Sequence, residues 1–201
     1  IPVYGPDCEI HITSNTTWDM DFATCCDVIV HPNVTLTIAC DVAFCPTSKI
    51  KVLPGGILVL DGCKLFCGVP DFQWQGVRVY GTGSGGYQGM INGSYSQGRV
   101  VMRNNAEINY ARVALDLWDG INYNTTGGIV DAKDAGFNNN GMAIRALYFQ
   151  NIHPVNGHVF DYNAKFTNCS FIIDKGYPKE GDVFHHHVVL AKLKGLKFVT
   201  L

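Results

Sequence analysis

Three related stretches decide the fold: VVMRNNAEINYARV at residues 100–113, IVDAKDAGFNNNGM at 129–142 and VFDYNAKFTNCSF at 159–171. They align without gaps at one constant offset, which takes Val101 to Val130 and Val130 to Val159. Two further positions of this alignment hold similar residues throughout, namely Ile108, Phe137 and Phe166 at one and Ala106, Ala135 and Ala164 at the other. Several matches in one fixed spacing predict a repeat architecture.

A second repeat stands earlier in the chain, at the slightly shorter offset that takes Cys40 to Cys63. VTLTIACDV at 34–42 matches ILVLDGCKL at 57–65, and both alternate apolar and polar positions as β-strands do. Short strands broken by Asn, Gly and Asp, recurring at a period of roughly 20–30 residues, are typical of a β-solenoid. The predicted fold class is therefore all-β, a right-handed single-stranded parallel β-helix. A β-sandwich is the alternative, but its strands need no constant spacing.

The whole chain of 201 residues suits one domain. We expect an N-terminal cap with the first strand over residues 1–26 and β-helix coils over 27–201. Only 16% of the residues are charged and the formal net charge is -2, so a nucleic-acid partner is not expected. No apolar run reaches the roughly 20 residues of a membrane span. No cofactor motif is present, and no cofactor is expected.

Eight cysteines occur, seven of them in the first third of the chain, without the Cys-x-x-Cys spacing of zinc ribbons. Their even number favours disulfides and an oxidising compartment, although buried free thiols are the alternative. Stacking at the repeat spacing places equivalent cysteines about one strand apart, within disulfide reach. The expected pairs are Cys40 with Cys63, Cys45 with Cys67, and Cys8 with Cys25 or Cys26.

Several motifs resemble segments of secreted β-helix proteins of Bacteroidetes, many of which use the type IX export pathway. The motifs are ITSNTTW at 12–18, KIKVLPGGILVLDG at 49–62, CG at 67–68 followed by WQGVRVYG at 74–81, and HVVL at 187–190 followed by KGLKF at 194–198. The resemblance covers most of the chain and implies the fold and a secreted, extracellular or cell-surface location. Those proteins usually carry a C-terminal sorting domain, so the resemblance also implies a fragment or a processed form.

A histidine run provides the candidate metal site. His185 and His187 would point to the same side of a strand, where Asp182 could join them around Zn²⁺. A polar outer strand face is the favoured alternative, because the ligands lack a recognised spacing.

If the chain is an enzyme, the candidate acids and bases of a carbohydrate-active site are Asp131, Lys133, Asp116 and Arg145, since parallel β-helices often act on acidic polysaccharides. The repeat places no second carboxylate beside Asp131 on the neighbouring coils, so solvated turn residues are the favoured interpretation. Candidate ligand-binding aromatics are Trp118, Tyr87 and Tyr123, whose flat faces could stack on sugar rings. The glycine-rich segment at 81–90 is expected to be a long surface loop, the kind of segment that carries binding function.

The predicted function is a non-catalytic extracellular structural or adhesive module. The apolar stretch at 188–201 would leave an open β edge, which could pair with a second copy and build a fibre. The alternative is a carbohydrate-active enzyme or a sugar-binding module with a polysaccharide partner.

Overall fold

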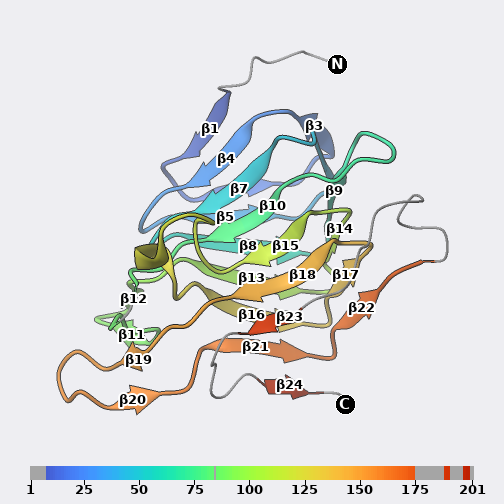
Figure 1. The fold of residues 1–201 in the computed structure, drawn as a ribbon. Helices are drawn as coiled ribbons and strands as arrows, with labels where there is room; N and C mark the ends of the chain where they lie inside the picture. The colour runs from blue at the N-terminus through green and yellow to red at the C-terminus, as the bar shows by residue number, and fades with distance from the viewer. Residues whose placement is uncertain (1–7, 84, 175–187, 191–196, 200–201) are drawn as a thin grey trace.

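The computed structural model describes residues 8–83, 85–174, 188–190 and 197–199. The chain winds through three parallel sheets, one turn after another (Figure 1). Sheet A contains β1 (Glu9–Ile12), β4 (Asp27–Val30), β7 (Lys49–Val52), β10 (Gly76–Val79), β15 (Val113–Asp116), β18 (Met142–Ala146) and β23 (Val188–Leu190). Sheet B contains β2 (Thr16–Trp18), β5 (Thr35–Ile38), β8 (Ile57–Asp61), β13 (Arg99–Arg103), β16 (Ile129–Lys133), β21 (Ala164–Thr167) and β24 (Lys197–Val199).

Sheet C contains β3 (Phe22–Thr24), β6 (Val42–Phe44), β9 (Lys64–Cys67), β14 (Glu107–Asn109), β17 (Gly136–Asn138) and β22 (Ser170–Ile172). Each of the first six coils contributes one strand to each sheet, and the strands of successive coils pair in parallel. The fold is therefore the predicted parallel β-helix. Residues 9–24, which lie within the expected cap, already form a complete first coil. Among the described residues, no helix has the length and apolarity needed to cross a membrane.

The core fills the space enclosed by the three sheets. Alternate residues of each strand point inward, and strand pairing places them directly above one another in columns. One column of sheet B is Leu36, Leu58, Val100, Val130 and Ala164, and the next is Ile38, Leu60, Met102, Ala132 and Phe166. Every member of both columns is buried. Stacked apolar columns of this kind remove the inner face of every coil from water.

Between the first two aligned stretches, the predicted repeat spacing is right for sheet C and wrong by one position in sheet B. Ile108 pairs with Phe137 as expected, but Val130 pairs with Val100 rather than Val101. The turn before β14 contains two residues with positive φ, Asn104 and Asn105, where the next coil has only Asp134. A gapless alignment cannot represent that extra turn residue.

The third repeat departs further from the predicted spacing. Phe137 pairs with Phe171 rather than with Phe166, and Phe166 instead follows Ala132 in sheet B. The long segment between β18 and β21 explains the difference. The Ala164 prediction is wrong for the same reason, because the residue stacked after Ala135 at the coil corner is Cys169.

Two disulfides connect the first two coils, Cys8 with Cys26 and Cys25 with Cys45, with Cα–Cα distances of 4.6 and 4.7 Å. The pairing of Cys8 with Cys26 is one of the two predicted possibilities. The pairing of Cys45 with Cys67 is wrong, because Cys67 stacks on Phe44 and its side chain therefore points to the other face of the sheet.

The predicted pair of Cys40 and Cys63 is also absent, and both remain buried thiols. The two residues precede the paired strands β6 and β9 at equivalent positions, so the expected stacking is present without the bond. Burial raises the pKa of the Cys63 thiol to about 12, which keeps it protonated and unreactive at neutral pH.

Thiol counting tests these pairings. We expect four titratable thiols in the unfolded, unreduced protein, namely Cys40, Cys63, Cys67 and Cys169, and eight after reduction. Peptide mapping without reductant should recover the two disulfides described above. A count of two thiols, with a peptide linking Cys40 to Cys63, would contradict the structure.

Opposite faces of β8 give a matched test of the register. Leu60 is buried in the core column, whereas its neighbour Val59 lies half-buried on the outer face. We expect Leu60→Ala to lower the free energy of unfolding by about 2–5 kcal/mol and Val59→Ala by less than about 1 kcal/mol. Urea denaturation followed by circular dichroism measures both. Equal losses would mean that the faces are assigned wrongly.

Candidate functional site

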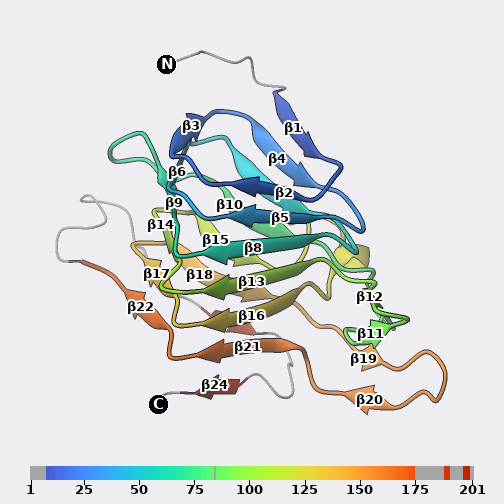
Figure 2. The ribbon, with the colours of Figure 1, turned by 180° about the vertical axis from the view of Figure 1, so that it is seen from behind.

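Three long insertions gather at one edge of the β-helix. In the first three coils, the turn from sheet A to sheet B takes only three or four residues. In the next three coils it takes residues 80–98, 117–128 and 147–163. These segments contain the hairpin strands β11 (Met90–Ile91), β12 (Ser94–Tyr95), β19 (Asn151–Ile152) and β20 (Val159–Phe160), and the 3-10 helix η1 (Tyr123–Thr125). Figure 2 shows them together on one side of the molecule, and we call them the insertion lobe.

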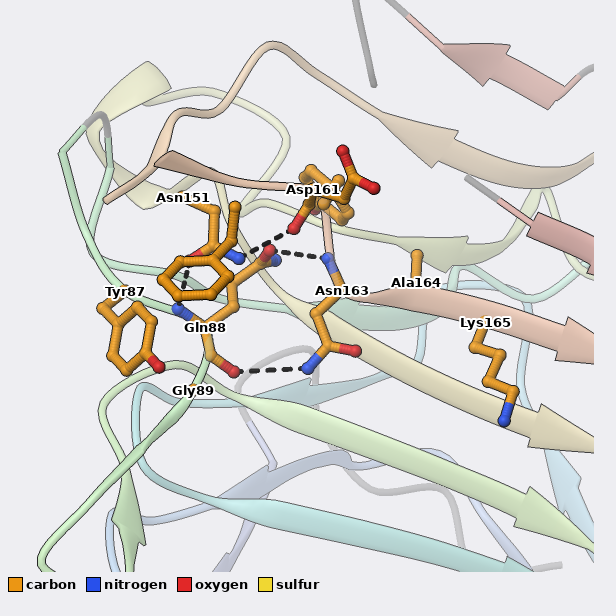
Figure 3. A pocket seen from close by; sticks show the side chains of 10 residues that line it. Tyr87, Gln88, Gly89, Asn151, Asp161, Asn163, Ala164 and Lys165 are labelled. Atoms are coloured by element: carbon orange, nitrogen blue, oxygen red, sulfur yellow. Dashed lines mark hydrogen bonds between the residues drawn. The ribbon is translucent and has the colours of Figure 1, made fainter. Parts of the chain in front are cut away.

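The side chain of Gln88 connects all three insertions. It is fully buried, and its Nε2 donates to the carbonyls of Gly127 and Gly128 at 2.9 and 3.3 Å. Its Oε1 accepts from the backbone N–H of Asn163 at 2.8 Å. The backbone N–H of Gln88 donates to Oδ1 of Asn151, also at 2.8 Å (Figure 3). Because buried amides are costly to leave unpaired, this network fixes the insertions relative to one another.

The buried side chain of Tyr162 also stabilises the insertion lobe. The hydroxyl of Tyr162 donates to the carbonyl of Gly128 at 2.9 Å, and its ring packs edge-on against Phe149. Burial raises the pKa of Tyr162 far above its ordinary value, so this phenol stays a hydrogen-bond donor. Nδ2 of Asn151 donates to the carbonyl of Asp161 at 2.8 Å and fixes the segment that leads into β21.

Two open pockets flank this segment. The Tyr87 pocket has a volume of about 400 Å³ and is lined by Tyr87, Gln88, Gly89, Asn151, Phe160, Asp161, Tyr162, Asn163, Ala164 and Lys165 (Figure 3). The Tyr148 pocket has a volume of about 420 Å³ and is lined by Tyr148, Phe149, Gln150, Asn151, Val159, Phe160, Asp161 and Tyr162. Asn151 and residues 160–162 belong to both, so the pockets share a wall.

Aromatic rings occupy the rim of both pockets. Phe160 is 43% exposed and lies 5.8 Å from the ring of Tyr87, measured between centroids. His153 packs edge-on against Tyr87 at 4.8 Å, and His158 packs edge-on against Phe160 at 4.6 Å. Tyr148 is 46% exposed at the second pocket. Tyr87 and Phe160 therefore offer flat apolar faces supported by neighbouring rings, and Tyr148 adds a further exposed ring.

Two charged side chains complete the polar lining. Asp161 and Lys165 are both exposed, and among the described residues neither forms an ion pair. The carboxylate next to Lys165 in sheet B is Asp131, which is already paired with Arg99 at 3.4 Å. The lining of the Tyr87 pocket thus includes one negatively charged acceptor and one positively charged donor, each without a charged partner in the described chain.

The sequence-predicted catalytic residues lie on two different sheets. Asp116 and Arg145 are neighbours on the outer face of sheet A, and Nε of Arg145 donates to Asp116 at 2.9 Å. Burial raises the pKa of Asp116, although Arg145, Arg78 and Trp118 oppose that effect. Asp131 and Lys133 both belong to β16 in sheet B instead. The structure therefore does not bring the four predicted residues together.

The three predicted ligand-binding aromatics also lie apart, with Tyr87 in the first insertion and Trp118 and Tyr123 in the second. Tyr87 lines the first pocket. Trp118 is buried, lies under Tyr123 at a centroid distance of 5.3 Å, and packs on the guanidinium of Arg145 at 5.5 Å. This aromatic and ion-pair cluster fixes the second insertion on sheet A.

The histidine pair His185 and His187 lies outside the described residues. Within the described part of the chain, no group of three or more His, Cys, Asp and Glu side chains could hold a metal ion.

Sequence reasoning missed most of the pocket residues, including Gln88, Asn151, Phe160, Asn163 and Lys165. Gln88 and Asn151 occur in segments that interrupt the repeat, where no column predicts a neighbour. Phe160, Asn163 and Lys165 fall within the third aligned stretch, whose predicted spacing is wrong, so its columns gave the wrong neighbours. The available signal was the interruption itself, since strand-like stretches on either side of 80–98 and 147–163 are unusually far apart.

No protein-family model, curated protein or solved structure matches this chain. Any function of the site therefore has to be inferred from the geometry of its own residues.

Removing the amide of Gln88 should loosen the lobe. Gln88→Leu would leave the N–H of Asn163 and the buried carbonyl of Gly127 without their partner, and the buried carbonyl alone costs about 1–3 kcal/mol. We expect faster hydrogen exchange at residues 86–89, 127–128 and 163, with protection of β8 and β13 unchanged. Gln73→Leu is the control, because Gln73 donates one bond, to Ala111, outside the lobe. Equal effects of both variants on lobe exchange would contradict the assigned role of Gln88.

Proposed function

We propose that this chain is a non-catalytic extracellular binding module, in which the β-helix is a rigid scaffold and the insertion lobe binds carbohydrate. The observation that carries the proposal is the pair of open pockets built where three insertions meet around Gln88. Binding sites are commonly placed on loops that a rigid scaffold positions. The buried amide network preorganises the pockets, which lowers the entropic cost of binding.

The chemistry of the lining favours a sugar. Tyr87 and Phe160 present aromatic faces of the kind that pack against the C–H face of a pyranose ring. Asp161 can accept from sugar hydroxyls, and Lys165 can donate to them. An apolar platform beside a few convergent polar groups is the usual composition of a small-molecule site.

Binding without cleavage fits the arrangement of the acids. Glycosidases place two carboxyl groups on either side of one scissile bond. Asp116 and Asp131 belong to different sheets, and each is already paired with an arginine. An adhesive module is therefore favoured over the carbohydrate-active enzyme, which remains the alternative.

Secretion is supported by the two disulfides, because such bonds persist in oxidising compartments. The resemblance to secreted β-helix proteins of Bacteroidetes points to the same extracellular or cell-surface location. End-to-end association into a fibre stays a prediction, since most of the stretch 188–201 lies outside the described residues. Light scattering over a range of concentrations would test it.

A polysaccharide screen tests the proposed function. We expect the protein to bind at least one member of an immobilised panel of neutral and acidic polysaccharides, and Phe160→Ala to weaken that binding about tenfold. Phe72→Ala is the matched control, because Phe72 is 57% exposed in a loop outside the lobe. Failure of the wild-type protein to bind any polysaccharide, or equal binding by both variants, would refute the proposal.

A further inference from the structure

The two pockets lie side by side along one wall. That wall is formed by 160–162 together with Asn151, and Phe160 lines both pockets while remaining 43% exposed. Beneath it, Tyr162 and Asn151 are buried and hydrogen-bonded to Gly128 and Asp161. The shared wall is thus held in place by buried hydrogen bonds, and it carries the exposed ring of Phe160. We call this wall the ridge, and it separates two pockets of nearly equal volume.

Each of the two pockets has an aromatic ring of its own. Tyr87 stands on one side of the ridge, with its centroid 5.8 Å from that of Phe160. Tyr148, 46% exposed, stands on the other side. The rings therefore follow one another in the order Tyr87, Phe160, Tyr148 across both pockets. Such a series suits a ligand made of repeated flat units better than a single compact ligand.

The volumes of the two pockets also favour a ligand made of repeated units. Each pocket, at about 400 Å³, is near the lower limit of the usual range of roughly 300–1,000 Å³ for small-molecule sites. A ligand confined to one pocket would leave the exposed face of the ridge and the second aromatic ring uncovered. Linked units that occupy both pockets would add their contacts, because the second unit binds at the high effective concentration set by the first.

We infer that the insertion lobe binds a linear oligosaccharide chain that crosses Phe160, with sugar units in the Tyr87 pocket and in the Tyr148 pocket. This inference rests on the proposed function and specifies its ligand class. Asp161 lines both pockets and can accept hydroxyl hydrogen bonds at the crossing point. Lys165 lies in β21 and lines the Tyr87 pocket, so its ammonium group can donate to the sugar unit bound there.

The test is a size series of oligosaccharides prepared from whichever polysaccharide binds in the screen. By calorimetry, we expect affinity to rise at least tenfold from the shortest binding oligomer to one long enough to cross Phe160, and then to level off. Tyr87→Ala and Tyr148→Ala divide the site. We expect the shortest oligomer to respond to only one of these variants and the long oligomer to lose affinity with both.

The outcomes separate the two proposals. If no saccharide binds, the proposed function fails. If saccharides bind with one affinity at every length, or if the long oligomer responds to a single tyrosine, the chain-binding inference fails while the proposed function stands. Phe72→Ala and the thermal melting curve of each variant show that a lost response does not come from unfolding.

Discussion

The stacking of each strand on its copy in the next coil is the constraint on which the rest of the structure depends. Because side chains alternate between faces, a slip of one residue would turn a core column outward. Every coil must therefore return to the same register, whatever the length of its turns. Turn residues with positive φ absorb the differences, with Gly62 alone in one coil, Asn104 and Asn105 in the next, and Asp134 alone after that. Asn, Asp and Gly adopt this backbone conformation at the lowest cost.

The same constraint explains where the insertions occur. A long segment is tolerated if both of its ends remain in register, and extra length adds only a small loop-closure cost. The turns from sheet A to sheet B meet this condition in three successive coils, so their insertions stack as the coils do. Stacking brings Gln88 from the first insertion to Gly127 in the second and to Asn163 at the end of the third. A site made from distant segments follows directly from the periodicity of the scaffold.

The sequence alone was sufficient for the fold, because the repeat is visible wherever coils have equal length. It was insufficient for exact register, since one additional asparagine before β14 shifted the pairing of sheet B. The error extended to the cysteines: the interval from Cys45 to Cys67 is one position shorter than the interval from Cys40 to Cys63, and this difference places Cys67 on the opposite face from Cys45. The pocket residues were hardest to find because they lie either in segments that the repeat does not cover or in the third aligned stretch, whose spacing was wrong. Tyr87 was identified from its side-chain chemistry, whereas Gln88, whose role depends on burial, was not.

The disulfides and the lobe occupy different parts of the solenoid for a physical reason. In a repeat protein each unit is stabilised mainly by its neighbours, so the first coil, as the structure describes it, has a strand partner on one side only. Both disulfides connect that coil to the second, one where sheet A begins and one where sheet C ends. The insertions arise from the fourth, fifth and sixth coils, whose strands are paired on both sides in sheets A and B. The stacked core therefore holds the insertion lobe rigid at the fourth to sixth coils. The same lobe on the first coil would move with strands that are paired on one side only.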